Sequence, residues 1–495
     1  MPVTAAPAVW DPFPVEAWDE AAARHLLRRI GWTATAADVA RAQQEGLAAT
    51  LDRHFPQRLA ELPEPVSIAK LRGYLEEIAP KARNASEQDR RQIFREAREH
   101  MRQAQLDLSL QWLQFAAGPQ NSAAEKWVSF LSNVYVVGAV KVHDASQLYD
   151  HQAVLRRFAF APAPLLTKAV SQSPAMVMYL DLQQSQREAP NENFARELLE
   201  LFVLGEGHYT ERDIKEAARA FTGYRQRLGR FYFIPRQHDP STKTVFGHTG
   251  RYYGDDVIDL AYTQPSAAWN LPQRMARYYL SEAGLTEQDL AALGDWWRRT
   301  GFDLHQLVRH FFGSRLFFAP QYRGNYIKSP VQFYLGALQD LQLDVMPLPR
   351  FTLIPLQQMG QALFDPPNVR GWVGGRTWIN SVTLAARRQL VRELFNPLDP
   401  MRLNADEQRD LATAANAGHG RFNMAGEELR QYFPAADAAA NARSLAASFL
   451  PVPVSPDYLA TLAAALHSAG PPAVTLNRER LVLEAVLQTP EYQLC

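Results

Sequence analysis

The chain has 495 residues, of which 47% are hydrophobic, so it can bury one large core or two to three smaller ones without disulfides or metals. Lysine plus arginine (52) balances aspartate plus glutamate (52), which disfavours recruitment of a nucleic-acid backbone or an anionic membrane surface. The single cysteine, Cys495, rules out an intramolecular disulfide and a cysteine-based metal cluster.

The first ten residues carry no visible export signal. They lack a basic segment followed by an apolar one, and no later stretch approaches the roughly 20 apolar residues that a membrane span requires. The sequence as written therefore predicts a cytoplasmic protein without a membrane span.

Helical signals dominate the chain from its start. Thr35 and Asp38 form a capping-box pattern that opens a helix, and residues from about 81 to 105 mix both charges densely, which is typical of a solvated helix face. We expect a mainly α fold, a large multi-helix single domain with a small β-hairpin insertion around residues 228–248. Its expected parts are an N-terminal helical segment (1–120), a core with the polar clusters (121–395) and a C-terminal helical layer packed on that core (396–495).

The first polar cluster lies on a helix predicted from residue 191 to a stop at Gly205. Apolar side chains share one helical face, and an amide and charged residues form a stripe across the other. Together with the starting amide, the residues of interest are Asn191, Glu192, Asn193, Arg196, Glu197 and Glu200.

This stripe has two interpretations. It can be a hydrogen-bonded network at a helix interface, built around a pair between Arg196 and Glu200. It can instead supply metal ligands or an acid and a base, which requires carboxylates from more than one helix. A single helix cannot assemble a catalytic site, so the stripe taken alone favours the structural interpretation.

The second cluster lies in the predicted β element, where the stretches 230–234 and 243–246 are rich in aromatic and β-branched residues. A turn between them holds His238, Asp239 and Lys243. His238 could serve as a base or a ligand oriented by the carboxylate. Equally, Asp239 is an ordinary turn former that His238 only hydrogen-bonds, and both interpretations stay open.

The third cluster occupies residues 359–375, where two prolines and four glycines predict an irregular loop. The loop presents Asn368, Arg370 and Trp372, a combination that can hold a polar ring or an anion by stacking and hydrogen bonds. A rigid loop that merely caps the core is the alternative. No phosphate-binding loop, zinc-protease motif, serine-hydrolase elbow or dinucleotide fingerprint accompanies these clusters.

Together, the three clusters resemble the bacterial family known as domain of unknown function 1800. The matching segments span nearly the whole chain: 25–29, 191–201, 218–223, His238-Asp239 with Lys243, 328–330, 366–372, 378–380 and 489–492. The resemblance implies a mainly α-helical bacterial protein and, as for many relatives, a periplasmic or extracellular location as the alternative to the cytoplasm. It also implies a possible alkaline-phosphatase-like protein partner, but no reaction.

One departure from the family bears on cofactors. Relatives commonly carry a Phe-Trp-His-Asn-His-Phe-like segment, whereas residues 130–135 read Phe-Leu-Ser-Asn-Val-Tyr, with Ser132 and Val134 at the two histidine positions. If those histidines bind a divalent metal in relatives, this chain should bind it weakly or not at all. The sequence identifies no other cofactor.

Two functions follow as hypotheses. In the first, the protein is an enzyme acting on a polar carbohydrate-like or anionic substrate, with carboxylates from Glu192, Glu197 and Glu200 and a proton-transfer unit of His238 and Asp239. The substrate-binding residues are then Asn191, Asn193, Arg196, Lys243, Asn368, Arg370 and Trp372. In the second, it is a non-catalytic binding or accessory protein for a phosphatase- or sulfatase-like partner. The first requires that the clusters converge, and the second predicts an exposed apolar patch.

Overall fold

Helices account for most of the structure. The computed structural model describes residues 9–424, 426–467 and 472–495. The first ten α-helices are α1 (Glu20–Ile30), α2 (Ala36–His54), α3 (Val66–Asn84), α4 (Glu87–Ala117), α5 (Ser122–Val134), α6 (Ala145–Arg157), α7 (Ala163–Ser171), α8 (Pro174–Tyr179), α9 (Glu192–Glu197) and α10 (Glu211–Ala220). The others are α11 (Gly254–Thr263), α12 (Asn270–Tyr279), α13 (Glu287–Arg299), α14 (Leu304–Phe312), α15 (Pro330–Leu341), α16 (Pro349–Gln358), α17 (Ser381–Phe395), α18 (Ala405–Asn416), α19 (Ala438–Phe449), α20 (Pro456–Leu466) and α21 (Pro472–Leu487).

Several helices start at a side chain that accepts a hydrogen bond from one of their first backbone N–H groups. The Thr35 side chain accepts a hydrogen bond from the N–H of Asp38 at the start of α2. Thr210 and Asp213 form a complete capping box at the start of α10. The mainly helical fold predicted from the sequence is confirmed.

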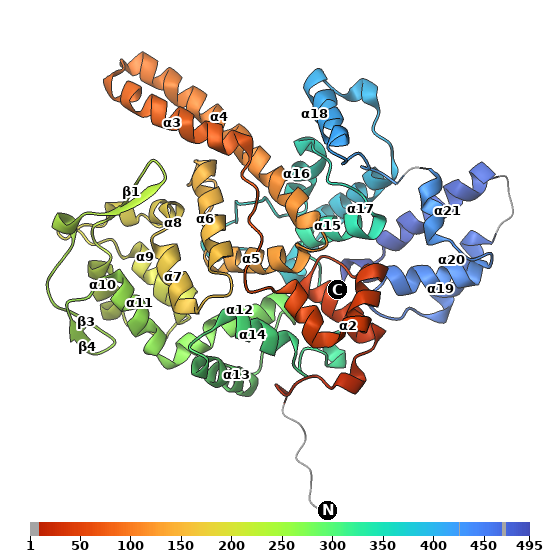
Figure 1. Cartoon of the computed structure of the whole chain (residues 1–495), viewed down its shortest axis with the longest axis horizontal. Helices are drawn as coiled ribbons and strands as arrows, with labels where there is room; N and C mark the ends of the chain where they lie inside the picture. Colours follow the sequence, from red (N-terminus) through yellow and green to blue (C-terminus); the bar gives the residue numbers. More distant parts are fainter. Residues whose placement is uncertain (1–8, 425, 468–471) are drawn as a thin grey trace, which may run out of the picture.

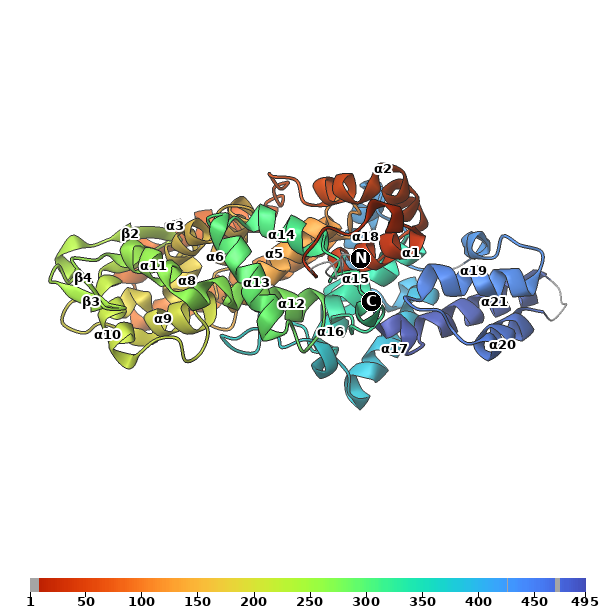
Figure 2. The same cartoon turned by 90° about the horizontal axis from the view of Figure 1, so that it is seen from below.

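The molecule is elongated, with the β-hairpins at one end and α19, α20 and α21 at the other (Figure 1, Figure 2). The last residues return to the middle of the molecule, where the N–H of Cys495 donates to the carbonyl of Tyr326 at 2.8 Å. Buried apolar side chains from Trp10 to Tyr492 form one contiguous cluster. The predicted single large domain therefore has one main core, while its division at residues 120 and 395 stays a prediction.

Helices α3 and α4 lie side by side and project from the body as an arm (Figure 1). The charged stretch predicted between residues 81 and 105 lies on this arm, and Ser86 caps α4, so the stretch is divided between two helices. Its ion pairs, such as Lys81 with Glu77, are exposed, as expected of a solvated face. No helix in the described ranges is long and apolar enough to cross a membrane.

Helix α5 lies in the middle of the molecule and contacts α1, α4, α6 and α12 (Figure 1). Most of its side chains are buried, including the charged Glu125 and Lys126. Glu125 has a buried partner in Arg156, with 2.5 Å between Oε2 and Nη2. Because the partners of α5 come from distant parts of the chain, this helix brings their side chains to one central place.

The β element consists of two hairpins instead of one. Strand β1 (Tyr224–Arg227) pairs with β2 (Arg230–Phe233), and β3 (Lys243–Val245) pairs with β4 (His248–Gly250), both antiparallel. Each pair closes through two residues with positive φ, Leu228-Gly229 and Phe246-Gly247. Such two-residue turns match the twist of adjacent strands, so the predicted stretches pair with their neighbours and not with each other.

Candidate functional site

A cavity of about 590 Å³, here called the central cavity, opens where α5, α6, α12 and α15 meet the loop between α16 and α17. Its volume lies in the range of roughly 300–1,000 Å³ that is usual for small-molecule sites. Its aromatic lining comprises Trp32, Trp112, Phe130, Tyr278, Tyr326, Phe364, Trp372 and Trp378. Its amide side chains are Asn133, Gln152, Asn270, Gln332 and Gln361, and its charged ones are Lys126, Glu200, Glu206, Arg274, Arg277 and Arg370.

A π-helical segment brings Glu200 from the first predicted cluster to this cavity. Helix α9 continues directly into η3 (Leu198–Val203), whose wider turn is a feature found frequently at functional sites. Oε2 of Glu200 accepts a hydrogen bond from the hydroxyl of Tyr209 at 2.6 Å, and Oε1 accepts one from Nη2 of Arg370 at 2.8 Å. Both oxygens of this carboxylate therefore have partners inside the protein.

The pair expected between Arg196 and Glu200 is wrong. Arg196 donates to Glu211 on α10 at 2.9 Å from both Nη atoms and to Glu192 at 3.4 Å. The π-helical turn takes Glu200 out of the α-helical register, in which it would lie four residues beyond Arg196 on the same stripe. Arg196 thus serves the interface of α9 with α10 and does not line the central cavity.

The remaining members of the first cluster also lie outside the central cavity. Asn191 caps α9 by accepting a hydrogen bond from the N–H of Asn193 at 2.9 Å. Glu197 is half-buried, and burial, reinforced by the nearby charge of Glu200, raises the pKa of its carboxyl. Asn191 therefore shapes the start of the helix, while Glu197 is a half-buried carboxyl whose pKa is raised beside the cavity residue Glu200.

Arg370 and Trp372 of the third cluster line the central cavity. Arg370 bridges two carboxylates, with Nη2 at 2.8 Å from Glu200 and Nη1 at 2.5 Å from Glu206. Asn368 accepts a hydrogen bond from the backbone N–H of Arg370 at 2.8 Å and so shapes the loop. The ion pairs of Arg370 tie the loop between α16 and α17 to the end of η3.

The backbone of Trp372 is held on both sides by one amide of α5. Oδ1 of Asn133 accepts from the N–H of Trp372 at 2.7 Å, and Nδ2 donates to its carbonyl at 3.1 Å. Gly371 permits this approach, since its φ is 79° and a Cβ there would lie 2.1 Å from Oδ1 of Asn133. The position of the Trp372 ring on the cavity wall is therefore set by a clamp from α5.

Three further cations line the central cavity without a carboxylate partner in the described part of the chain. Arg274 donates to the carbonyls of Leu201 at 2.9 Å and Asn133 at 2.6 Å, and Lys126 donates to the carbonyl of Gly31 at 3.0 Å. Arg277 is exposed on the cavity wall and makes no hydrogen bond or ion pair through its side chain in the described structure. The cavity therefore carries uncompensated positive charge.

Burial and mutual repulsion act on these cations. Burial lowers the pKa of Arg274 to about 10, with Arg277 and Arg370 adding to the effect. Burial also lowers the pKa of Lys126 to about 7. The acids of the cavity, Glu200 and Glu206, both bind Arg370, so only one of their two negative charges is left to offset the other cations.

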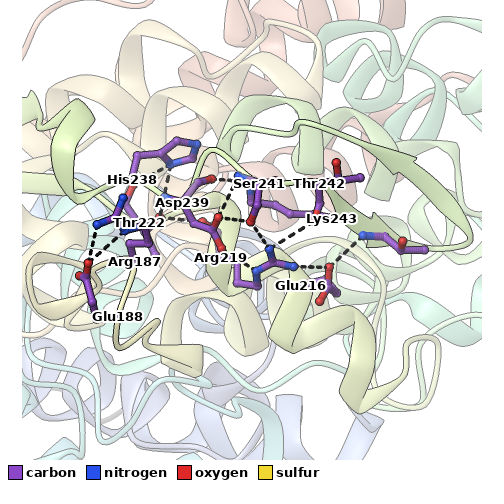
Figure 3. A network of polar contacts seen from close by, with 11 residues as sticks. Arg187, Glu188, Glu216, Arg219, Thr222, His238, Asp239, Ser241, Thr242 and Lys243 are labelled. Carbon is purple, nitrogen blue, oxygen red and sulfur yellow. Dashed lines mark hydrogen bonds and ion pairs between the residues drawn. The ribbon is translucent and has the colours of Figure 1, made fainter.

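The second predicted cluster lies in a separate set of contacts, the loop network, formed by Glu216, Arg219, Thr222, His238, Asp239, Ser241, Thr242 and Lys243 (Figure 3). Arg219 donates to Asp239 at 2.7 Å and to Glu216 at 2.8 Å. The backbone N–H and the hydroxyl of Ser241 both donate to the other oxygen of Asp239. Although burial acts in the opposite direction, the bonds from Ser241 and Arg219 hold the pKa of Asp239 well below its usual range.

His238 and Lys243 are buried in the same network. Nδ1 of His238 lies 3.1 Å from the carbonyl of Thr222, and its ring stacks on Tyr253 at 4.4 Å between centroids. Nζ of Lys243 donates to the carbonyls of Asp239 at 2.6 Å and Ser241 at 3.0 Å. Burial lowers the pKa of His238 and of Lys243. The contact of His238 holds this loop against the turn after α10, and the bonds of Lys243 brace the loop internally.

The structure therefore brings together part of the predicted site. Glu200, Arg370 and Trp372 share the central cavity. The loop network is a separate assembly, and its members are absent from the described cavity lining. Glu192 and Arg196 belong to the interface of α9 with α10. The predicted convergence thus holds for the first and third clusters through Glu200 and Arg370, but not for the second.

Ser132 and Val134, the two positions at which the family resemblance implies histidine, have different surroundings. Ser132 lines the central cavity, and its hydroxyl accepts a hydrogen bond from Nε2 of Gln152 at 3.1 Å, whereas Val134 is buried in the core. Within the described residues, no three or more histidine, cysteine, aspartate or glutamate side chains gather as ligands for a metal ion. Position 132 is thus a cavity position in this fold.

Sequence reasoning missed most of the cavity residues. Lys126 lies beside Trp127 on a helix whose side chains are mostly buried, but the sequence gives no signal that separates it from the neighbouring Glu125. Arg274, Arg277 and Tyr278 follow one another at helical spacing on α12, which places them on one face. Nothing in that spacing indicates which element the face meets, so their convergence with Lys126 is visible only in the folded chain.

The comparisons with known proteins agree with the motifs. The sequence model of one family, described as a protein of unknown function (DUF1800), matches residues 25–494. No curated protein and no solved structure gives a match. The matched range covers the central cavity and the loop network. The chain therefore belongs to the DUF1800 family.

Proposed function

We propose that the protein binds an anionic, ring-containing compound of the carbohydrate class in the central cavity. One observation carries this proposal: Arg274, which is half-buried, and Arg277 line a cavity with aromatic walls and have no carboxylate partner in the described structure. A charged group that is buried or partly buried normally has a partner of opposite charge, because moving it out of water without such a partner costs free energy. A ligand carboxylate would supply the missing charge and form strong charge-assisted hydrogen bonds.

The remaining lining fits the ring of such a ligand. Trp372 offers a half-buried indole face, and its N–H has no hydrogen-bond partner in the described structure. Amide side chains, among them Gln152 and Gln361, can donate to and accept from hydroxyl groups. An aromatic face combined with a few convergent polar groups is the usual composition of a small-molecule site.

The proposal uses only some of the residues predicted from the sequence. Glu200 and Arg370 would orient the loop that carries Trp372, and they would not bind the anion, since their charges are already paired. His238 and Asp239 have no role in the proposed binding, because their side chains already form hydrogen bonds within the loop network. The expected phosphatase- or sulfatase-like partner stays a prediction, as do the absence of nucleic-acid binding and the compartment.

Isothermal titration calorimetry tests the proposal. We expect saturable binding of uronic-acid di- and trisaccharides and much weaker binding of their neutral counterparts. Arg277→Gln should weaken binding of the acidic saccharides by about 10-fold or more, because a hydrogen bond to a charged group contributes roughly 1.5–3 kcal/mol. Arg388→Gln, which changes an exposed arginine of α17 outside the cavity, is the matched control and should bind like wild type.

Two results would contradict the proposal. One is equal affinity for acidic and neutral saccharides, which would remove the role of the cations. The other is the absence of saturable heat with every saccharide of the panel at concentrations where the protein stays folded.

A further inference from the structure

Lys126 differs from the other cations of the central cavity in its chemistry. Only 4% of this residue is exposed, and its Nζ makes one hydrogen bond, to the carbonyl of Gly31. An ammonium has three N–H donors, so this group has unused donors in a place where water is largely excluded. A neutral donor would suffice to satisfy the carbonyl at the end of α1, so the helix end alone does not explain a lysine there.

The surroundings of Lys126 favour the neutral amine. Burial lowers its pKa to about 7, with Arg29 and Lys328 adding to the effect and Cys495 opposing it. No carboxylate lies within ion-pair distance of its Nζ in the described structure. A substantial fraction of the group is therefore an unprotonated amine near neutral pH, and an unprotonated lysine is a nucleophile toward carbonyl carbon.

Two other buried lysines show what distinguishes this one. Nζ of Lys243 donates to two carbonyls within the loop network, where Asp239 lies nearby. Lys328 places its Nζ 3.7 Å from the ring centroid of Tyr492 and is absent from the described cavity lining. Nζ of Lys126 makes one hydrogen bond and lies 5.7 Å from the ring centroid of Tyr279, and of these three buried lysines Lys126 alone lines the central cavity.

The cavity also supplies groups that would hold an anionic carbonyl compound next to this amine. Arg274 and Arg277 line the same cavity and can bind a carboxylate. Tyr278 follows them on α12, burial raises the pKa of its hydroxyl, and that hydroxyl has no hydrogen-bond partner in the described structure. A protonated phenol can donate a hydrogen bond to a carbonyl oxygen and so favour attack on its carbon.

We propose that Lys126 forms an imine with an anionic carbonyl compound bound in the central cavity. This inference rests on the proposed function, since the arginines select the anion; an acidic saccharide offers the required carbonyl in the open-chain form of its reducing end. The Nζ lone pair attacks the carbonyl carbon, and a proton passes from nitrogen to oxygen to give a carbinolamine. Loss of water breaks the carbon–oxygen bond and leaves a carbon–nitrogen double bond, so the step needs no oxidant or reductant.

Reductive trapping tests the inference on the full-length chain. The protein is incubated with glyoxylate, a small anionic aldehyde, and cyanoborohydride, which adds hydride to an imine and converts it to a stable secondary amine. Peptide mass spectrometry then locates the added carboxymethyl group. We expect Lys126 to be modified at least about 10-fold faster than exposed lysines such as Lys70, because only Lys126 lies in the cavity whose arginines would hold the anionic aldehyde.

Two variants give matched controls. Lys126→Met should lose the fast adduct, and Lys70→Met should keep it. Because the rate at Lys126 is compared with that at Lys70 within one wild-type sample, the result does not depend on the folding of a variant. Arg277→Gln should slow trapping by about 10-fold, whereas Arg388→Gln should not. Modification of Lys126 no faster than of Lys70, or none at all, would overturn the inference.

The trapping and calorimetric results separate the two proposals. Saturable binding of acidic saccharides without fast trapping at Lys126 would leave the proposed function standing and reject the imine. Fast trapping without saccharide binding would support the amine chemistry and reject the carbohydrate class of the ligand.

Discussion

The central cavity and the loop network are both rich in charged side chains, yet they differ in how those charges are satisfied. In the loop network, Asp239 accepts from Arg219 and Ser241, and Lys243 donates to two carbonyls. In the central cavity, Lys126 and Arg277 have few or no partners in the described structure. A saturated polar network stabilises a fold, whereas uncompensated charge on a cavity wall costs stability and suits a ligand.

This contrast shows that sequence motifs alone are a poor indicator of the ligand site in this protein. His238, Asp239 and Lys243 form the pattern that most resembles a proton-transfer unit, but their hydrogen bonds fasten a loop to α10 (Figure 3). Lys126 belongs to no recognisable catalytic motif, yet its Nζ makes fewer hydrogen bonds than the Nζ of Lys243 in the loop network. The number of partners of a polar group is therefore a better guide to function here than the types of residue that lie close in sequence.

The largest expected effect on stability is in the loop network. Asp239→Ala should lower the apparent free energy of unfolding by about 2–3 kcal/mol, because it leaves the Nε of Arg219 and the N–H of Ser241 without an acceptor. Urea denaturation measures this change, and Asp295→Ala, at an exposed position of α13, is the matched control. Calorimetric binding by the folded Asp239→Ala protein should match wild type. If Asp239→Ala instead lost binding while its stability stayed unchanged, the loop network would be a better candidate for the ligand site than the central cavity.

A second expected effect is a pH dependence caused by Lys126. Its pKa is about 7 in the folded chain, against an ordinary value of 10.5, so the unfolded chain binds more protons between these limits. The free energy of unfolding should therefore rise with pH in this window, by up to about 1.4 kcal/mol per pH unit from this residue. Below the lower limit both states are protonated and the contribution is flat.

Comparison with Lys126→Met isolates this contribution from other titrating groups. Arg29, Lys328 and Cys495 also face the amine and are retained in the variant. Urea denaturation at about pH 6, 7.5 and 9 should give a difference in free energy of unfolding, wild type minus variant, that increases only above neutral pH. A difference that stays constant over the series would mean that Lys126 remains charged in the folded protein.

The smallest of the three effects concerns the clamp on Trp372. Gly371→Ala should cost about 1–2 kcal/mol more than Gly207→Ala, because both glycines have positive φ but only Gly371 is crowded, by Asn133. Thermal or urea denaturation of the two variants gives the comparison. Binding of acidic saccharides should weaken only in Gly371→Ala, since the ring of Trp372 moves with its backbone. Equal binding by both variants would show that this ring does not contact the ligand.

Much of the local structure could be predicted from the sequence because it depends on neighbours in the chain. The helix start at Thr35 and Asp38, the buried apolar face of the helix from residue 191 and the motifs of the DUF1800 family all appear in the structure or the comparison as predicted. Such features depend on side-chain periodicity and on backbone groups only a few residues away.

The tertiary structure alone decided which polar groups share a cavity. The π-helical turn moves Glu200 away from Arg196, Asn133 of α5 clamps a loop more than 200 residues later, and Lys126 meets the arginines of α12. Local spacing carries no information about these meetings, because they depend on how separate helices pack around α5. The sequence by itself therefore determined the family, the helices and their caps, whereas packing determined the site.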